Sequence, residues 1–490
     1  AQDGAVGDFP YLRAHQRHPW HSFLVQLAAI ALHRANESGA EHSAERWRAM
    51  LLDSADGMAS AFALVEPDLA KPAFLQPPVP EGTLAKWKRI ETADALDILV
   101  TAKSHDVKAQ RVIDASLETW MFALLSLQTM QGFLGAGNYG IARMNGGFAS
   151  RPEVGLASSL TPSVRFRRDV RVLLDSRDAV THKFGYSPKG GHALLWLLPW
   201  DGASALPLSE CDAHFIEICR RIRFSEHSNV LQCEYKSTES ARLEAKSRNG
   251  VVGDPWIPVD ASGEKALTVS AKGLDYVLTQ SLLWGSAYER PPALVVRQDD
   301  CFFIGRVLVR GQGKTEGFHE RVLRIPPKVR SFLQRPDDTS ILARISKDWL
   351  KHTSTLKLKV LKPALLTLVQ GAPEKLNFKD DKADPELERF ESRIDQCFFD
   401  VLFSAIENAD GNLEGLADIS AVWGHTLVEI GLEVLDAASG RVPLPDARAY
   451  RAKSVSRRVF FGAATNNHFP VDGVRSSRTE ENGANNERSI

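Results

Sequence analysis

The segment Gly311-Gln312-Gly313-Lys314-Thr315 contains the G-K-T tripeptide with which many nucleotide hydrolases hold a phosphate chain. In such a phosphate loop another glycine stands five positions before the G of G-K-T, and a long apolar helix follows. Here that position is Leu308, and the chain continues as Phe318-His319-Glu320-Arg321. The segment is therefore predicted to be a flexible loop that follows a strand. Nucleotide hydrolysis is the alternative hypothesis.

The same loop offers an amide at Gln312, a cation at Lys314 and a hydroxyl at Thr315. These groups suit a DNA minor groove, where amide side chains read a limited pattern and separate base steps. A hairpin tip without a ligand is the other interpretation.

Histidines are spaced by three at His15, His18 and His21. Zinc would require this spacing on a regular helix, but Pro19 interrupts it. We therefore expect half-exposed histidines at a helix entry, and metal binding is the alternative.

The cysteines contain no C-x-x-C pair, so they indicate neither a zinc site nor a disulfide framework. They are Cys211, Cys219, Cys233, Cys301 and Cys397. No nucleophile–base pair or carboxylate dyad has a recognisable spacing. We expect no catalytic residue, no metal and no cofactor.

The stretch from Gly132 to Gly147 holds six glycines in sixteen residues. Glycine loses extra backbone entropy on folding, so this density indicates a backbone that approaches a ligand or turns with positive φ. A surface for a phosphate chain or a nucleic-acid groove is one interpretation. A long connection between core elements is the other.

Positive charge occurs in local clusters, although the net charge is only −1. Such clusters allow contact with nucleic acid, but a solvated face is the simpler interpretation of each. They comprise Arg165, Arg167, Arg168 and Arg171; Arg220, Arg221 and Arg223; and Arg451, Lys453, Arg457 and Arg458. A further segment, 102–108, precedes a predicted helix. Asp106 is a candidate cap for that helix, and phosphate contact by Lys103 and Lys108 is the alternative.

The chain of 490 residues is long enough for two or three domains. Its composition, 43% hydrophobic and 25% charged, is typical of a globular protein. The cysteine usage fits a reducing cytoplasm, where we expect the protein, and no apolar run reaches the roughly 18 residues of a membrane span. The start at Ala1 lacks a signal-peptide pattern and suggests that native residues precede it.

Hydrophobic periodicity predicts helices over 20–35, 43–64 and 107–131, and strands in the middle of the chain. The predicted strands are 170–174, 193–198, 266–269, 293–296 and 301–309. Helical periodicity returns over 328–369, 385–408, 413–438 and 446–461, with short polar connectors. The fold class is therefore α+β: a large mixed α/β N-terminal domain over 1–325, then an antiparallel four-helix bundle over 326–465. Residues 466–490 are expected to form a disordered tail.

Several short stretches, in a constant order over most of the chain, resemble the large subunit, CasA, of the type I-E CRISPR surveillance complex Cascade. They are Phe23–Leu32, Lys71–Gln76, Leu127-Gln128-Thr129, Asn145-Gly146-Gly147, His214–Glu217, Gly250–Val259, and loop 311–317 with His319-Glu320-Arg321. The resemblance implies a non-catalytic subunit that reads the PAM in double-stranded DNA from the minor groove and wedges the duplex open for the guide RNA. It also implies other Cascade subunits and a helicase-nuclease as partners, and no membrane.

The resemblance assigns roles to particular residues. The glycine loop that approaches the groove matches Gly135, Gly137, Asn138 and Gly140, the lysine finger matches Lys265, and the wedge matches loop 311–317. Within that loop, Gln312, Lys314 and Thr315 are candidates, with the choice between Gln312 and Thr315 open. Contacts to the DNA backbone and target engagement are expected from Lys103, His105, Lys108 and Arg143.

Some members of the family carry cysteine pairs suited to zinc, whereas this sequence has none. The lysine finger lacks a second adjacent lysine, so the PAM preference is open. The competing hypotheses are the large subunit of another type I CRISPR subtype, a nuclease or nucleotide hydrolase that uses Gly313-Lys314-Thr315, and a scaffold that contacts only protein.

Overall fold

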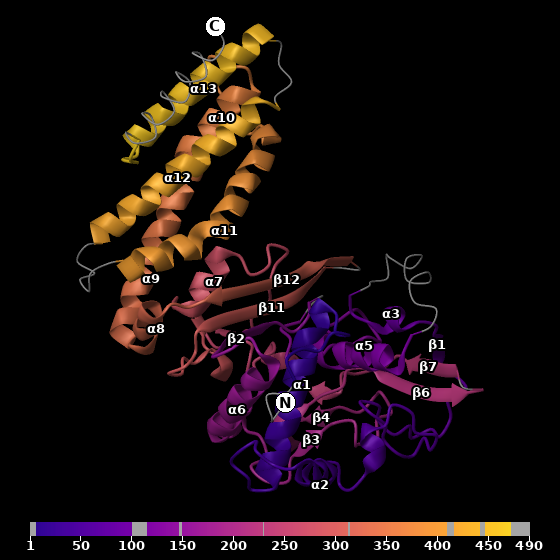
Figure 1. Cartoon of the computed structure of the whole chain (residues 1–490). Helices are drawn as coiled ribbons and strands as arrows, with labels where there is room; N and C mark the ends of the chain where they lie inside the picture. Colours follow the sequence, from indigo (N-terminus) through magenta and orange to yellow (C-terminus); the bar gives the residue numbers. More distant parts are fainter. Residues whose placement is uncertain are drawn as a thin grey trace. The chain divides into compact units, whose positions relative to one another are not determined.

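The structure is a computed structural model that describes residues 6–99, 115–146, 149–228, 230–311, 314–408, 416–441 and 446–471 (Figure 1). It is a mixed helical and sheet protein, as the sequence predicts, and it divides into two compact units. The first contains the chain up to Leu274 and Ser286–Ile325, and the second contains Asp275–Gly285 and the chain from Pro326 onward.

Helix α1 (Arg17–Arg34) runs through the first unit. Its apolar residues face all sides, and it contacts α2 (Ala44–Ser54), α5 (Leu117–Met130) and α6 (Pro162–Phe184), so it is buried as predicted. Helix α2 is shorter than predicted, because it stops before the positive-φ residues Asp56 and Gly57. Helix α5 begins after Ser116, whose hydroxyl accepts a hydrogen bond from the Thr119 amide, and residues 107–114 of the predicted helix lie outside the described residues.

Three predicted strands are wrong. Residues 170–174 lie inside α6, because Val170, Leu173, Arg177 and Val180 recur at helical spacing on its buried face. Residues 293–296 overlap a 3-10 turn at Pro292–Leu294, and Ala266 forms only an isolated bridge with Val259. Of 193–198, only the first residues belong to a strand, β3 (His192–Leu194).

The main sheet of the first unit is antiparallel, in the order β12-β11-β2. Its strands are β2 (Glu153–Ala157), β11 (Phe302–Gly311) and β12 (Lys314–Arg324), which confirms the predicted strand 301–309. A second antiparallel sheet has the order β1-β7-β6, from Lys88–Ile90, Val230–Lys236 and Arg221–His227. Short pairs complete the unit: β3 with β5 (Cys211–Ile216), β4 (Leu206–Pro207) with β8 (Leu243–Glu244), and β9 (Val259–Asp260) with β10 (Tyr288–Glu289). Helix α3 (Ala93–Leu96) packs on α5.

The second unit is helical, as predicted. Its helices are α7 (Tyr276–Leu283), α8 (Pro327–Gln334), α9 (Pro336–Thr355), α10 (Lys362–Val369), α11 (Asp384–Asn408), α12 (Leu416–Ser439) and α13 (Asp446–Asn466). A π-helical segment, Leu356–Leu361, joins α9 to α10 just before Pro363, whose missing N–H and bulky ring disturb the regular ladder.

Aromatic side chains form the centre of this second unit. The rings of Trp349 and Trp423 stack with centroids 4.5 Å apart, and Phe398 meets both edge-on. Helix α7 joins this core although it is distant in sequence: the Tyr276 ring lies 5.0 Å from Phe398, and its backbone N–H donates to Asp395 at 2.6 Å. None of the helices among the described residues combines the length and apolar character that crossing a membrane requires.

Candidate nucleic-acid interface

The glycine loop follows α5 directly and turns on two glycines. Gly135 has φ +109° and Gly137 φ +81°, and the Asn138 amide donates to the Gly135 carbonyl at 3.0 Å. The Leu134 amide in turn donates to the Asn138 carbonyl at 2.9 Å, which closes the turn. A Cβ added at Gly135 would meet nothing within 4 Å, so this position faces open space. At Gly135 the backbone of the turn therefore has no side chain between it and this open space.

Arg220 holds this loop from beneath. It is buried, and its guanidinium donates to the carbonyls of Asn138 and Tyr139 and to the Gln131 side chain. Gly140 closes the loop by backbone contact, since a Cβ there would lie 2.4 Å from the carbonyl carbon of Gly132. The loop is therefore a fixed feature of the fold, in which Gly140 is packed against backbone and the half-buried Gly135 has open space where a side chain would stand.

Arg143 does not fit the expected contact with a DNA backbone. Its side chain is 2% exposed, and its Nε lies 3.1 Å from Asp254 Oδ2, with Nη1 3.6 Å from Glu217 Oε1. Its guanidinium also lies 3.9 Å above the Phe215 ring. We correct the expectation: burial and two carboxylates engage Arg143, so it supports the loop from inside.

The end of the glycine-rich stretch packs against the segment that carries Lys265. Gly250 approaches it so closely that a Cβ would lie 2.6 Å from the Asn145 amide nitrogen and 2.7 Å from the Ala266 side chain. The Asn145 side chain also donates to the Ala266 carbonyl at 3.4 Å. Lys265 is exposed, on a turn that Asp260 closes by accepting from the Lys265 amide at 3.1 Å. The structure therefore places the lysine beside the glycine-rich stretch.

The predicted wedge loop joins β11 and β12. Gln312 and Gly313 lie outside the described residues, as do Lys103, His105 and Lys108, and of Lys314 only the backbone is described. Thr315 pairs with Arg310 across the hairpin, and its hydroxyl donates to the Leu99 carbonyl at 2.7 Å. The hairpin thus lies against the last described residue before the segment that carries Lys103 and Lys108.

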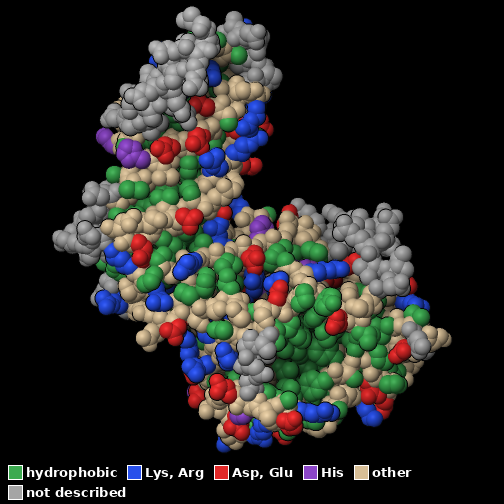
Figure 2. Space-filling model, viewed as in Figure 1, with side chains coloured by type: hydrophobic (Ala, Val, Ile, Leu, Met, Phe, Trp, Pro, Cys, Tyr) green, Lys and Arg blue, Asp and Glu red, His purple; other side chains and the backbone are tan. Residues whose placement is uncertain are grey.

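Most arginines of the clusters 165–171 and 220–223 do not lie on a solvated face, although Arg171 is exposed. Arg165 of α6 is buried and pairs with Glu153, and Arg168 donates to Asp300 at 2.7 Å. Arg220, Arg221 and Arg223 are buried as well. Carboxylates or backbone carbonyls inside the first unit engage these five guanidinium groups, so they do not form a surface for a polyanion. On the face seen in Figure 2, positive and negative side chains alternate without a field of one sign.

The three spaced histidines face three different carboxylates. His15 is hydrogen-bonded to Asp97 and His21 to Asp169, both at 2.7 Å, while His18 lies 3.5 Å from Glu153. The expected half-exposed entry is wrong for His15 and His18, which are buried. Burial and the nearby Arg165 cation lower the pKa of His21 to about 4. Among the described residues no cluster of histidine, cysteine and carboxylate side chains is arranged to hold a metal.

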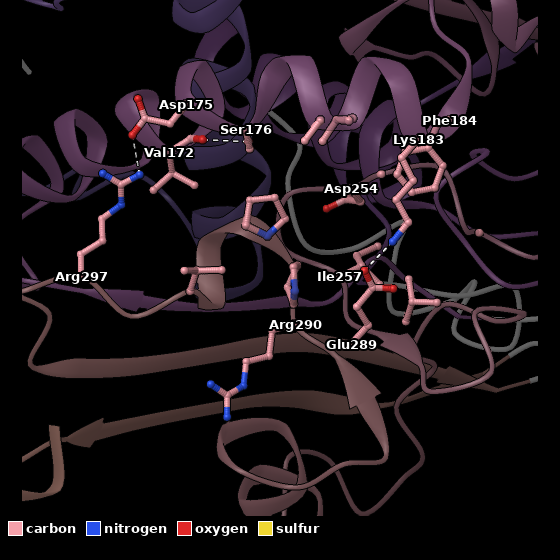
Figure 3. A pocket seen from close by; sticks show the side chains of 18 residues that line it. Val172, Asp175, Ser176, Lys183, Phe184, Asp254, Ile257, Glu289, Arg290 and Arg297 are labelled. Carbon is pink, nitrogen blue, oxygen red and sulfur yellow. Dashed lines mark hydrogen bonds and ion pairs between the residues drawn. The ribbon is translucent and has the colours of Figure 1, made fainter. Parts of the chain in front are cut away.

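A pocket of about 330 Å³ lies in the first unit (Figure 3). Apolar side chains of α6 and of segments 250–259 and 289–297 form most of its wall. Two ion pairs link α6 to segment 289–297 in its wall, Asp175 with Arg297 at 2.7 Å and Lys183 with Glu289. Gly250, which packs on the glycine-rich stretch, also belongs to this wall, so the pocket adjoins the candidate interface.

Sequence reasoning missed Arg310 and placed Arg220 only in a basic cluster. Arg220 holds the glycine loop, and Arg310 is a buried residue at the end of β11. The local sequence does not indicate the role of either arginine, because that role depends on which distant backbone or carboxylate the side chain meets.

Comparison with known proteins gives a fold. No family model matches the chain, and no curated protein matches it. A crystal structure of CasA from Thermus thermophilus matches with a TM-score of 0.57 and 16% identity, over 92% of this chain and 91% of that one. A second structure of Thermus thermophilus CasA (Cse1) matches with a TM-score of 0.56 and 14% identity, over 92% and 90%. The CRISPR-associated protein Cse1 from Acidimicrobium ferrooxidans matches with 0.54 and 14%, also over 92% and 90%. This chain therefore has the fold of the CasA (Cse1) proteins, along almost its whole length.

Proposed function

We propose that this chain is the large subunit of a type I-E CRISPR Cascade complex. In this role it recognises the PAM in double-stranded DNA through the minor groove and wedges the duplex open, so that the guide RNA begins to pair. The fold, which matches CasA proteins over 92% of the chain, supports membership in such a complex. The resemblance of the short stretches in the sequence supports the same assignment.

The observation that carries the proposal is the packing of the glycine-rich stretch on the Lys265 segment through Gly250. The stretch that begins with the backbone turn at Gly135 thus ends, at Asn145, against the segment that carries the exposed cation. The minor groove is narrow and offers few distinguishing groups, so a bare backbone and one lysine suit a reader that accepts several PAMs. Because Gly135 has no side chain, its backbone can approach base edges closely.

The hairpin β11–β12 supplies the wedge in this proposal. Replacing a DNA duplex by a guide–target heteroduplex is a nearly balanced exchange, so the wedge need only offset the unstacking of the first step, about a few kcal/mol. Residues of loop 311–317 perform this step, and the hydrogen bond from Thr315 to Leu99 steadies the base of the hairpin.

The chain itself cuts nothing in this proposal and uses no cofactor. Cleavage belongs to a helicase-nuclease that the complex recruits, and the helical second unit offers faces for neighbouring Cascade subunits and the displaced strand. The site of action is the cytoplasm, where the guide RNA and invading DNA meet.

Other functions receive less support. A phosphate loop needs a helix after its lysine, whereas Lys314 starts strand β12 and pairs with Gly311, which argues against nucleotide hydrolysis. The large subunit of another type I subtype remains the main competitor. A scaffold that contacts only protein would leave DNA affinity unchanged in Lys265→Ala and Gln312→Ala variants.

The decisive experiment measures binding of a guide-loaded complex to duplexes with and without the flanking motif. The complex is tested with the intact chain, without the chain, with the double variant Gln312→Ala and Thr315→Ala, and with Lys265→Ala. We expect PAM-dependent binding only with the intact chain. The exposed Lys272 gives a matched control, since Lys272→Ala should leave binding unchanged. Equal binding without the chain would refute the proposal.

A further inference from the structure

We propose that the guanidinium of Arg310 binds one phosphate of the target-DNA backbone, between the glycine loop and the hairpin β11–β12. The inference rests on the proposed function. It adds a phosphate-binding residue that neither the sequence resemblance nor the likeness of fold assigns.

Arg310 differs from every other buried arginine in the described part of the chain. Nine arginines are buried there, and eight of them have at least one hydrogen bond or ion pair: Arg143, Arg151, Arg165, Arg177, Arg220, Arg221, Arg223 and Arg242. Arg310 is only 7% exposed, and its Nε and Nη1 find no partner among the described residues. Buried donors without an acceptor are rare in folded proteins and call for an explanation.

The charge of Arg310 is also not neutralised by its surroundings. Burial and the neighbouring cation of Arg220 lower its pKa to about 10, and Asp97 is the carboxylate that opposes them. Asp97 is already engaged, since it is hydrogen-bonded to His15 at 2.7 Å, to Gln16 at 2.6 Å and to the Leu99 amide at 2.9 Å. Arg310 therefore stays cationic at neutral pH and faces no free anion within the described residues.

Arg310 lies on one of the two elements proposed to touch DNA, the hairpin β11–β12, and its neighbour Arg220 holds the other, the glycine loop. Arg310 pairs with Thr315 across the hairpin, directly after a shift of register between Val309 and Arg310. Such irregularities in a strand re-aim a side chain. Its neighbour Arg220 donates to the Asn138 and Tyr139 carbonyls of the glycine loop. A DNA strand that runs from the glycine loop to the hairpin would pass Arg310.

The chemistry favours a phosphate as the missing partner. Nε and Nη1 are donors of one rigid, planar fork, and a guanidinium of this kind matches the oxygens of a phosphate. A buried cation without a partner destabilises the free chain, and an anionic oxygen would remove that penalty on binding. Arg310 should therefore stabilise the DNA-bound chain and destabilise the free chain, whereas a structural arginine stabilises the free chain.

The test compares Arg310→Met with Arg223→Met. Arg223 is also buried, but it donates to the carbonyls of Lys71, Glu66 and Asp68. We expect Arg223→Met to lower the melting temperature of the chain, and Arg310→Met to leave it unchanged or raise it. In the guide-loaded complex, Arg310→Met should weaken binding to PAM-containing duplex about tenfold, the loss of one charge-assisted hydrogen bond. The slope of log affinity against log salt should fall by about 0.9.

Neutral methylphosphonate linkages, placed one at a time around the flanking motif and the first target pairs, locate the phosphate. At one linkage, Arg310→Met should cause no further loss. Three results would overturn the inference. In the first, Arg310→Met lowers the melting temperature as Arg223→Met does and leaves the salt slope unchanged. In the second, no single methylphosphonate linkage abolishes the effect of Arg310→Met, and in the third, Arg310→Met impairs only guide loading, which would assign the phosphate to RNA. If the complex binds PAM targets equally well without the whole chain, the proposed function itself fails. If PAM binding requires the chain but Arg310→Met has no effect, the proposed function stands and the inference about Arg310 fails.

Discussion

The Thr315 hydroxyl donates a hydrogen bond to the Leu99 carbonyl at 2.7 Å and so ties the hairpin β11–β12 to a residue far earlier in the chain. The bond fixes the base of the hairpin against the residue Leu99. It also gives Thr315 a structural task at the base of the loop. This favours another residue of the loop as the group that enters the duplex.

Replacing Thr315 by valine keeps the shape and β-branching but removes the donor. We expect Thr315→Val to lower the free energy of unfolding by about 1 kcal/mol. Opening of PAM-containing duplex, followed by stopped-flow fluorescence, should slow because the hairpin base loosens. Thr315→Ser keeps the hydroxyl and should behave like the wild type in both measurements. Identical behaviour of the valine and serine variants would show that the bond has no role.

Gly135 and Gly146 offer a matched pair within the glycine-rich stretch. An added Cβ meets nothing within 4 Å at either, but only Gly135 has a positive φ. Gly135→Ala should cost about 1–3 kcal/mol of stability through backbone strain and, at a temperature where the chain is folded, weaken PAM-dependent binding. Gly146→Ala should change neither quantity. Wild-type binding by a folded Gly135→Ala chain would remove this turn from the reading surface.

Arg143 should prove to be a stability residue. Arg143→Met leaves Asp254 and Glu217 buried with one cation fewer, so we expect a loss of about 3–5 kcal/mol in chemical unfolding. The exposed Arg171 of α6 gives the comparison, because Arg171→Met should stay within about 0.5 kcal/mol of the wild type. A stable Arg143→Met chain with a lowered salt slope for DNA binding would instead restore the expected contact with the DNA backbone.

Acid should destabilise the chain well before its carboxylates titrate. Burial, followed by the Arg165 cation at His21, lowers the pKa of that histidine to about 4, and burial lowers that of His214 to the same value. Because the unfolded chain binds these protons near pH 6.5, stability should fall as the pH drops from 6.5 towards 4, by about 1.4 kcal/mol per unit for each histidine.

Urea unfolding at pH 7.5, 6.0 and 5.0 measures this dependence. His214→Gln should flatten the profile, whereas His425→Gln, on an exposed position of α12, should not. A free energy of unfolding that stays constant over this range would contradict the neutral state of the buried histidines.

The helices were predictable from the sequence because their apolar spacing persists over many residues, as in α1 and α11. The strand predicted at 170–174 failed because its β-branched residues suggested a sheet, while the wider spacing from Val170 to Val180 produced one face of α6. Local composition therefore identified α1 and α11, but it mistook part of the long helix α6 for a strand.

The candidate site divides in a similar way. The glycine density of 132–147 marked the loop, since glycine is favoured wherever φ is positive. The surroundings of Arg143, Arg220 and Arg310 could not be predicted, because the sequence is the same whether a basic side chain faces water, a carbonyl or a distant aspartate. For these residues, tertiary contacts decide the outcome.

Helix α7 belongs to the second unit although its sequence lies within the span of the first, so the polypeptide passes between the units three times. No single cut can separate them. A fragment ending at Ile325 would carry Tyr276 and Trp284 away from Phe398 and Ser346, their partners in the second unit, and would expose an aromatic helix to solvent. The complementary fragment would lack one wall of its core. A dissection of this protein must therefore graft residues 275–285 onto the C-terminal piece.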